Sequence, residues 1–165
     1  MRARADQQVL VEMLYEAVYW RDDGAEERPP LDAMLADARN ARYVAEWGRE
    51  GDVAVVALDR QQEPVGAAWY RHFAAAEPGY GFVSEDLPEV SIAVLPEFRG
   101  QGVGNLLLGS LIARARAAGE RGLSLSVSTE NPARRLYARH GFAIQGEEGA
   151  SATMVLMLPE DTGSA

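Results

Sequence analysis

The stretch VLPEFRGQGVG, residues 94–104, decides how the rest of the sequence is interpreted. It joins an apolar run to a long apolar segment with helical spacing at 105–118, and it contains Gly100, Gly102 and Gly104. Glycine lets the backbone approach a ligand closely because it has no Cβ, and the first N–H groups of a helix have no partner within that helix. Together with the positive end of the helix dipole, such N–H groups favour the binding of a phosphate.

Two known kinds of nucleotide-binding loop fit this stretch less well. Its spacing is G-x-G-x-G and not the G-x-G-x-x-G of dinucleotide-binding folds, and no strand–helix unit precedes it at the start of the chain. The sequence has no G-K-[ST], which excludes a Walker-type loop. Arg99 directly precedes the glycines and offers a charge-assisted donor for an anion. A glycine-rich turn without a ligand stays open as the alternative.

Periodicity on both sides of the loop predicts a mixed α/β layer fold. The run LSLSVS at 123–128 alternates apolar and polar residues, as expected for a strand with one buried face. Asn131 followed by Pro132 predicts the start of a helix, which should end at Gly141. The other predicted strands are 53–58, 64–73, 89–95, 142–144 and 153–158, the other predicted helices are 6–20 (with Asp6 as N-cap), 31–38 and 41–47, and loops are predicted at 22–30 and 74–88.

Length and composition describe one ordinary globular domain. With 165 residues and a hydrophobic share of 47%, the chain can bury a core without covalent staples. We expect one domain at 1–158 and a frayed tail at 159–165. The chain has no Cys, which excludes disulfides and thiolate catalysis, and its two histidines, His72 and His140, are too far apart to suggest a metal site.

Charge and hydropathy bear on partners and location. A net charge of −9 disfavours general nucleic-acid binding, which needs a basic face, and it suits a cationic or amine partner better. The N-terminal residues lack the apolar core of a signal peptide, and the chain has no apolar run long enough to span a membrane. We therefore expect a cytoplasmic protein that binds neither a membrane nor nucleic acid.

Two motifs resemble those of the GNAT superfamily of N-acetyltransferases. The first is Arg99-x-x-Gly102-x-Gly104, which matches the acyl-CoA loop [QR]-x-x-G-x-[GA] of that superfamily and follows a segment similar to its fourth strand. The second runs from Asn131 to Phe142 and is similar to N-x-x-A-x-x-L-Y-x-x-x-G-F, with one residue fewer between the Asn and the Ala. The resemblance is specific over 89–142 and extends to the N-terminal third only through the order of the elements.

This resemblance implies a fold and a reaction. The fold is a central mixed, mostly antiparallel sheet that is flanked by helices and has splayed central strands. The reaction is the transfer of an acetyl group from acetyl-CoA to a primary amine of a small molecule or peptide, by direct attack in a ternary complex. A non-catalytic acyl-CoA-binding sensor and a purely structural interaction domain are the alternatives. No metal is implied, and a homodimer stays open.

The resemblance also implies which residues bind the cofactor. The N–H groups of the glycine loop would hold the pyrophosphate of coenzyme A, and the backbone of the splayed strand would pair with the pantetheine. The N–H of Val94 would in addition polarise the thioester carbonyl. The residues implied in cofactor binding are Ile92, Ala93, Val94, Arg99, Gly100, Gln101, Gly102, Val103, Gly104, Asn105, Asn131 and Arg134.

Two residues are implied in catalysis. Tyr137 resembles the tyrosine of the superfamily that protonates the departing thiolate. Glu89, at the start of the cofactor strand, is the first candidate for the base that accepts a proton from the amine. His140 is expected to contact helix carbonyls. The other candidates for the base are Glu85, Asp86 and His72, and the candidates for the wall of the acceptor pocket are Trp20, Trp47, Trp69 and Tyr70.

Overall fold

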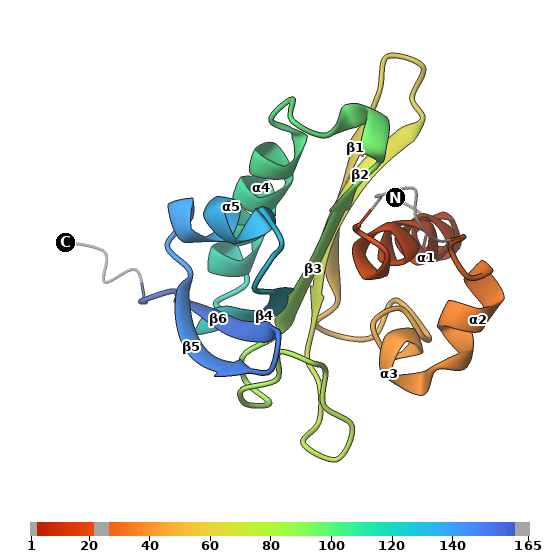
Figure 1. The fold of residues 1–165 in the computed structure, drawn as a ribbon. Helices are drawn as coiled ribbons and strands as arrows, with labels where there is room; N and C mark the ends of the chain where they lie inside the picture. The colour runs from red at the N-terminus through yellow and green to blue at the C-terminus, as the bar shows by residue number, and fades with distance from the viewer. Residues whose placement is uncertain (1–2, 22–26, 161–165) are drawn as a thin grey trace.

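The computed structural model of the chain describes residues 3–21 and 27–160 (Figure 1). Its helices are α1 (Ala3–Val18), α2 (Leu31–Ala36), α3 (Ala38–Ala41), α4 (Val103–Ala117) and α5 (Ala133–Arg139), with a short 3₁₀ turn at Pro96–Phe98. Its strands are β1 (Val53–Leu58), β2 (Pro64–Arg71), β3 (Glu89–Val94), β4 (Gly122–Ser128), β5 (Ala143–Glu148) and β6 (Ser151–Met157). Every predicted strand is therefore present, although several ends differ by a few residues.

All six strands form one sheet in the order β1-β2-β3-β4-β6-β5. Neighbouring strands are antiparallel, except that β3 and β4 are parallel. β3 and β4 share a single register pair, Glu89 with Ser124, and separate beyond it. The prediction of a mixed, mostly antiparallel sheet with splayed central strands is thus confirmed.

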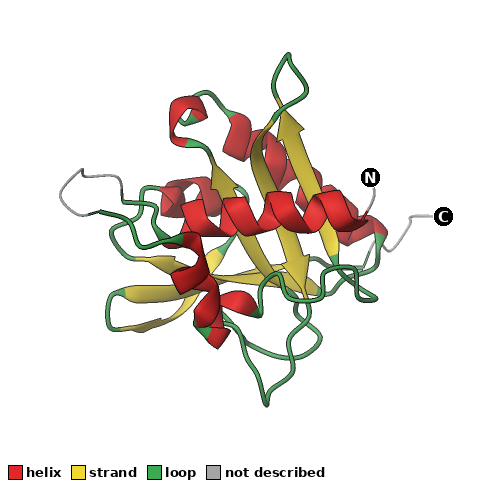
Figure 2. Ribbon diagram, turned by 90° about the vertical axis from the view of Figure 1, so that its right-hand side faces the viewer, coloured by secondary structure: helices red, strands yellow, loops and turns green. Residues whose placement is uncertain are grey.

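Helices cover both faces of this sheet (Figure 1). α4 packs across β1, β2 and β3 on one face, and α1 crosses the strands on the other face, as Figure 2 shows. The alternation of side chains along β2 supplies both layers: Ala68 and Tyr70 belong to the core under α4, whereas Ala67 and Trp69 belong to the core under α1. The sheet therefore separates two cores, and β2 and β3 contribute to both.

The N-terminal third differs from the prediction in two places. α1 begins at Ala3, so Asp6 lies inside the helix and is not its N-cap. The predicted helix at 41–47 is instead the end of α3 followed by turns, because Glu46 has a φ of 50° and Gly48 a φ of 109°, and a right-handed helix cannot continue through such residues.

Some expectations are not tested by the structure. Residues 22–26 of the predicted loop and residues 161–165 of the predicted tail lie outside the described residues. The assignment of 1–158 to one domain also stays a prediction.

A buried ion pair fixes the segment after α3 against the sheet. Arg71, at the end of β2, is only 1% exposed and donates to Asp52 from Nε at 3.1 Å and from Nη2 at 2.6 Å. Its Nη1 donates to the carbonyls of Arg42 and Ala45 at 2.9 and 2.8 Å. These two carbonyls lie on either side of Tyr43 in the chain, so Arg71 sets the position of that tyrosine.

Asp52→Ala should destabilise the fold strongly, because it leaves the buried guanidinium of Arg71 without its counter-charge. We expect the free energy of unfolding, measured by urea denaturation, to fall by about 3–5 kcal/mol. Glu130→Ala removes the exposed partner of Arg21 and is the control, with an expected loss below about 1 kcal/mol. Equal losses in the two variants would contradict the role given to the buried pair.

Candidate active site

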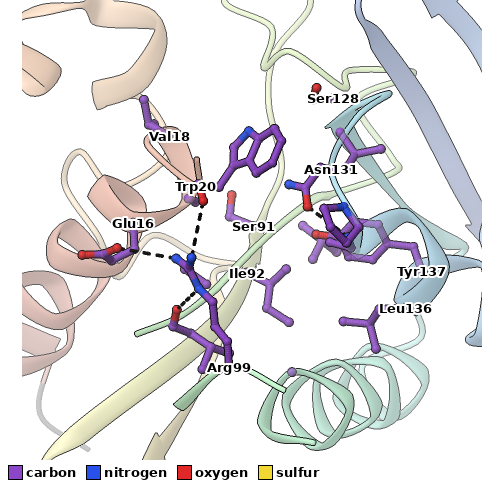
Figure 3. Close-up of a pocket in the computed structure, with 18 of the residues that line it drawn as sticks. Glu16, Val18, Trp20, Ser91, Ile92, Arg99, Ser128, Asn131, Leu136 and Tyr137 are labelled. Atoms are coloured by element: carbon purple, nitrogen blue, oxygen red, sulfur yellow. Dashed lines mark hydrogen bonds and ion pairs between the residues drawn. The ribbon is translucent and has the colours of Figure 1, made fainter. Parts of the chain in front are cut away.

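The separation of β3 and β4 opens a cavity of about 1000 Å³. The C-terminal part of α1, the free edge of β3, the glycine loop with the start of α4, and α5 form its wall (Figure 3). Both predicted catalytic residues, Glu89 and Tyr137, line the cavity. So do all of the predicted cofactor residues except Gln101 and Arg134. Residues that are far apart in the sequence are thus brought to one site.

The glycine loop has a row of N–H groups without an acceptor. Gly100 and Gly102 have φ angles of 76° and 85°, which side chains rarely adopt, and a Cβ at either position would meet no atom within 4 Å. No side chain caps α4, and among the described residues none accepts a hydrogen bond from the N–H groups of 100–105. Unpaired donors at a helix N-terminus, next to open space, fit an anion such as a phosphate.

Within the described residues, the edge of β3 that faces β4 has no strand partner beyond the pair of Glu89 with Ser124, and the carbonyl of Val94 at its far end accepts a hydrogen bond from Arg99. The N–H of Leu95 donates to the carbonyl of Val65 on the β2 side at 2.9 Å. Because the backbone groups of successive strand residues point to alternate sides, those of Ile92 and Val94 point into the gap, and those of Ala93 point toward β2. Of the three residues predicted to pair with pantetheine, Ile92 and Val94 thus direct backbone groups into the gap, whereas Ala93 lines the cavity with its backbone turned toward β2.

Arg99 lies at the cavity, but its guanidinium is tied to neighbouring groups (Figure 3). Its Nε donates to the carbonyl of Val94 at 3.0 Å, its Nη1 donates to the carbonyl of Trp20 at 3.4 Å, and its Nη2 lies 3.6 Å from Glu16. Arg99 thus links the glycine loop to α1 and to the end of β3. A guanidinium has further N–H donors, so the predicted contact with a phosphate is still available to it.

Two asparagines at the cavity organise α5. Oδ1 of Asn131 accepts the N–H of Ala133 at 3.0 Å, but the N-cap of α5 is Pro132 and not Asn131, so the predicted helix starts one residue later than expected. Oδ1 of Asn105 is 2.8 Å from Nε2 of His140. The ring of His140 was expected to contact helix carbonyls, but it bonds to Asn105 and so ties the end of α5 to the start of α4.

Gln101 and Arg134 are engaged elsewhere. Nε2 of Gln101 donates to the carbonyl of Glu97 at 3.1 Å. Nη1 of Arg134 donates to the carbonyl of Thr129 at 2.9 Å, and its Nη2 lies 4.0 Å from Glu147. Neither residue lines the cavity, so the geometry gives no support to a contact between these side chains and a cofactor.

Glu89 lies where the two strands meet, and only 2% of it is exposed. Its Oε1 accepts the N–H of Gly81 at 2.9 Å, and its Oε2 accepts a hydrogen bond from the hydroxyl of Tyr43. Burial raises the pKa of Glu89 to about 7, although the hydrogen bonds from Tyr43 and Gly81 act in the opposite direction. A carboxyl group with this pKa changes its charge near neutral pH, as a general base requires.

Tyr137 reaches into the cavity from α5 (Figure 3). Its ring packs edge-on against Phe142, with the ring centroids 6.0 Å apart, and 7% of the residue is exposed. Burial raises the pKa of the phenol above its ordinary value, so the hydroxyl keeps its proton at neutral pH. This hydroxyl has no hydrogen bond to any other described residue, and it is therefore free to donate to a bound molecule.

The alternative candidates for the base lie outside the cavity: they are Glu85, Asp86 and His72. The ring nitrogens of His72 contact the carbonyl of Glu85 at 2.9 Å and the carboxylate of Glu120 at 3.0 Å. Burial lowers the pKa of His72, but these two partners outweigh burial and raise it.

Of the aromatic candidates for the acceptor pocket, Trp20 lines the cavity, whereas Trp47, Trp69 and Tyr70 pack in or against the core.

Two tyrosines at the cavity were not predicted from the sequence. Tyr43, after α3, and Tyr80, in the loop after β2, stack with their ring centroids 6.2 Å apart, and both line the cavity. Tyr80 is 52% exposed and also lines a second cavity of about 410 Å³, which shares Ser126 and Ser151 with the first. Gly79 and Gly81, on either side of Tyr80, are the signal in the sequence for this loop. The loop backbone packs so closely that a Cβ at either position would overlap its neighbours.

Comparison with known proteins agrees with this geometry. Residues 12–142 match the model of the acetyltransferase (GNAT) family. The chain belongs to this family. The matched region contains both sequence motifs, the splayed strands and Glu89, so the GNAT resemblance seen in the motifs is confirmed, and the chain is an enzyme of the acetyltransferase class.

Two solved structures and one curated relative are similar to this chain. A phosphinothricin acetyltransferase from Sinorhizobium meliloti, solved in complex with AcCoA, is 29% identical, with a TM-score of 0.66 over 99% of this chain and 89% of that chain. A ribosomal-protein-alanine N-acetyltransferase from Brucella melitensis is 25% identical, with a TM-score of 0.62 over 95% and 97% of the two chains. The [ribosomal protein bS18]-alanine N-acetyltransferase of Haemophilus influenzae is 46% identical over 52 residues, which are 32% of this chain and only 36% of that relative.

Within residues 3–21 and 27–160, no helix combines the length and apolar character needed to cross a membrane. The same residues contain no group of three or more His, Cys, Asp or Glu side chains that could hold a metal ion.

Gly102→Val should abolish the binding of coenzyme A. A branched side chain at this left-handed position strains the loop and fills the space beside the unpaired N–H groups. We expect the heat of binding in isothermal titration calorimetry to disappear up to high micromolar ligand. Gly119→Val is the matched control, because Gly119 also has a left-handed φ (78°) and open space around it but does not line the cavity. Unchanged affinity in Gly102→Val, or an equal loss in Gly119→Val, would contradict the assignment of the loop.

Proposed function

We propose that this GNAT-family enzyme transfers the acetyl group of acetyl-CoA to a primary amine by direct attack within a ternary complex. The observation that carries the proposal is one continuous cavity, which runs from the unpaired N–H groups of the glycine loop, along the free edge of β3, to Glu89. These features offer a site for phosphates, an edge for an extended chain and a base. The chain has no Cys to carry the acetyl group, which favours direct attack.

The residues present fit coenzyme A, which combines phosphates with an extended arm that contains amides. The N–H groups of 100–105 would hold the diphosphate, and the backbone groups of Ile92 and Val94 would pair with the arm as an added strand does. Neutral N–H donors suit a protein of net charge −9, whose overall field repels an anion. Acetyl-CoA supplies the activated thioester carbon. The N–H of Val94 was expected to polarise the thioester carbonyl, but Val94 lies at the loop end of β3, about 16 Å along the strand from Glu89, so its backbone would contact the arm and not the thioester.

Glu89 is the base in this proposal. A primary alkylamine has a pKa of about 10.4, so presenting it as a free nucleophile at neutral pH costs about 4–5 kcal/mol. The carboxylate of Glu89 accepts the proton of the amine, and its pKa of about 7 makes the charged form available under those conditions. Tyr43 and Tyr80 line the cavity beside Glu89 and would form the wall that the acceptor contacts.

Tyr137 is the donor to the leaving sulfur in this proposal. Because burial raises the pKa of its hydroxyl, Tyr137 stays protonated and donates a hydrogen bond as negative charge develops on the sulfur, with proton transfer following late. The free hydroxyl in the cavity supports this role.

An amine acceptor is supported by two of the relatives, which are named as alanine N-acetyltransferases of ribosomal protein. The second candidate function is a non-catalytic acyl-CoA-binding module, which would need the glycine loop but neither Glu89 nor Tyr137. A carboxyl group with its pKa near neutrality and a free phenol in the same cavity favour the enzyme.

Release of free thiol from acetyl-CoA in the presence of a panel of amines and peptides tests the proposal. The chain has no Lys, so thiol release cannot come from acetylation of its own lysine side chains. Thiol release together with an acetylated product in mass spectrometry would support the enzyme. Calorimetric binding of coenzyme A without transfer to any acceptor would favour the binding module, and the absence of binding would overturn both.

The pH dependence of kcat/KM should report Glu89. We expect kcat/KM to rise as the pH passes through about 7, because Glu89 must lose its proton before it can accept one from the amine. Glu89→Gln should remove this rise, the rising limb of the pH profile. It should also lower kcat by about 10²–10⁴-fold and leave the affinity for coenzyme A unchanged. Glu85→Gln, outside the cavity, is the control. If kcat/KM of Glu89→Gln still rises through about pH 7, a group other than Glu89 causes the rise.

Tyr137→Phe should lower kcat by about 10²-fold, because it removes the donor to the leaving sulfur while the ring still packs against Phe142. Steady-state kinetics measures kcat, and calorimetry with coenzyme A should give nearly the same affinity as for the wild type. Equal kcat values in the variant and the wild type would reject the role of Tyr137.

A further inference from the structure

The hydroxyl of Tyr43 lies at the centre of a hydrogen-bonded network beneath the acceptor end of the cavity. It accepts the N–H of Tyr80 at 2.7 Å and is hydrogen-bonded to Oε2 of Glu89. A backbone N–H can only donate, so the phenolic proton of Tyr43 is directed toward the carboxylate. With the N–H of Gly81 on Oε1, each carboxylate oxygen of Glu89 accepts one donor of fixed direction.

Tyr43 is itself fixed from several sides. Its ring packs edge-on against Phe73, with the centroids 5.1 Å apart, and stacks on Tyr80. Its carbonyl accepts the indole N–H of Trp69 at 3.1 Å. Together with Arg71, which holds the carbonyls on either side, these contacts leave the hydroxyl a single position.

The loop at 79–81 closes tightly over this network. A Cβ on Gly79 would lie 2.8 Å from the hydroxyl of Tyr43 and would overlap Oε1 of Glu89. A Cβ on Gly81 would lie 2.5 Å from the backbone of Leu125 in β4. The two glycines therefore let the loop backbone reach both the phenol and the carboxylate.

From this geometry we infer that Tyr43 is a positioning residue: its hydroxyl holds the carboxylate of Glu89 in the orientation in which it accepts the proton of the acceptor amine. The inference rests on the proposed role of Glu89 as base. A donor on the carboxylate also favours its charged form, so the hydroxyl opposes the rise in the pKa of Glu89 that burial causes.

Among the described residues, no side chain other than Tyr43 donates a hydrogen bond to the carboxylate of Glu89. On β2, Arg71 is the register partner of Glu89, but its charge is paired with Asp52. On β4, the register partner Ser124 is neutral. The other charged side chains that line the cavity are Glu16, Arg21, Arg99 and Arg139.

Tyr43→Phe tests the inference by its effect on the pH profile of thiol release. Loss of the donor raises the pKa of Glu89, so we expect the rising limb of kcat/KM to move up by about one pH unit, with about a tenfold loss of activity below the limb. The KM for acetyl-CoA should not change. Tyr15→Phe is the matched control, because it removes a hydroxyl that donates to the carbonyl of Pro29 at 2.7 Å outside the cavity. A profile that falls at every pH without moving would mean that Tyr43 only packs, and would overturn the inference.

A second variant keeps the test decisive if Tyr43→Phe does not fold. 3-Fluorotyrosine at position 43 retains the ring and makes the hydroxyl a stronger donor, so the limb should move to lower pH. An unmoved limb would again overturn the inference. Glu89→Gln separates the two hypotheses: if its limb disappears while that of the position-43 variants stays unmoved, Glu89 remains the base and only the role of Tyr43 fails.

Discussion

β3 and β4 meet at Glu89 and Ser124 and then separate, so a sheet that is continuous on both sides has an unpaired edge in its middle. Backbone groups without partners form hydrogen bonds readily, so this edge, which lines the cavity, offers a strand-like surface that another molecule can complete. The same separation leaves room for the glycine loop at one end and places Glu89 at the other. The cavity, the loop and the base are thus consequences of one interrupted strand pair.

The parts of the site that depend on local sequence could be predicted. The glycine loop, the helix that follows it and the helix after Asn131 depend on residue types a few positions apart, and the structure has all three. The contact between Tyr43 and Glu89 spans 46 positions and depends on how the turn after α3 packs against the sheet, which no local pattern encodes. That turn exists because Glu46 adopts a left-handed conformation, and composition gives no sign of it.

The side of β3 to which each backbone group points could not be predicted from the sequence. The resemblance to the GNAT family indicated the right strand for the pantetheine, but it treated Ile92, Ala93 and Val94 alike. Only the hydrogen bond from Leu95 to the β2 side shows which of them direct their backbone into the gap. Arg99 is a similar case, because its neighbours in sequence suggest a phosphate ligand, whereas its contacts with Glu16 and Trp20 appear only once α1 is packed beside the loop.

The N–H donors of the glycine loop belong to the main chain, so they do not depend on which side chains the loop carries. Replacing the side chain of Gln101, which does not line the cavity, leaves its amide in place, whereas Gly100 and Gly102 have left-handed φ angles that other residues rarely adopt. An amide also carries no titratable proton. The binding of an anion by these amides therefore does not depend on the protonation state of the loop, whereas the step assigned to the buried carboxyl of Glu89 does depend on pH.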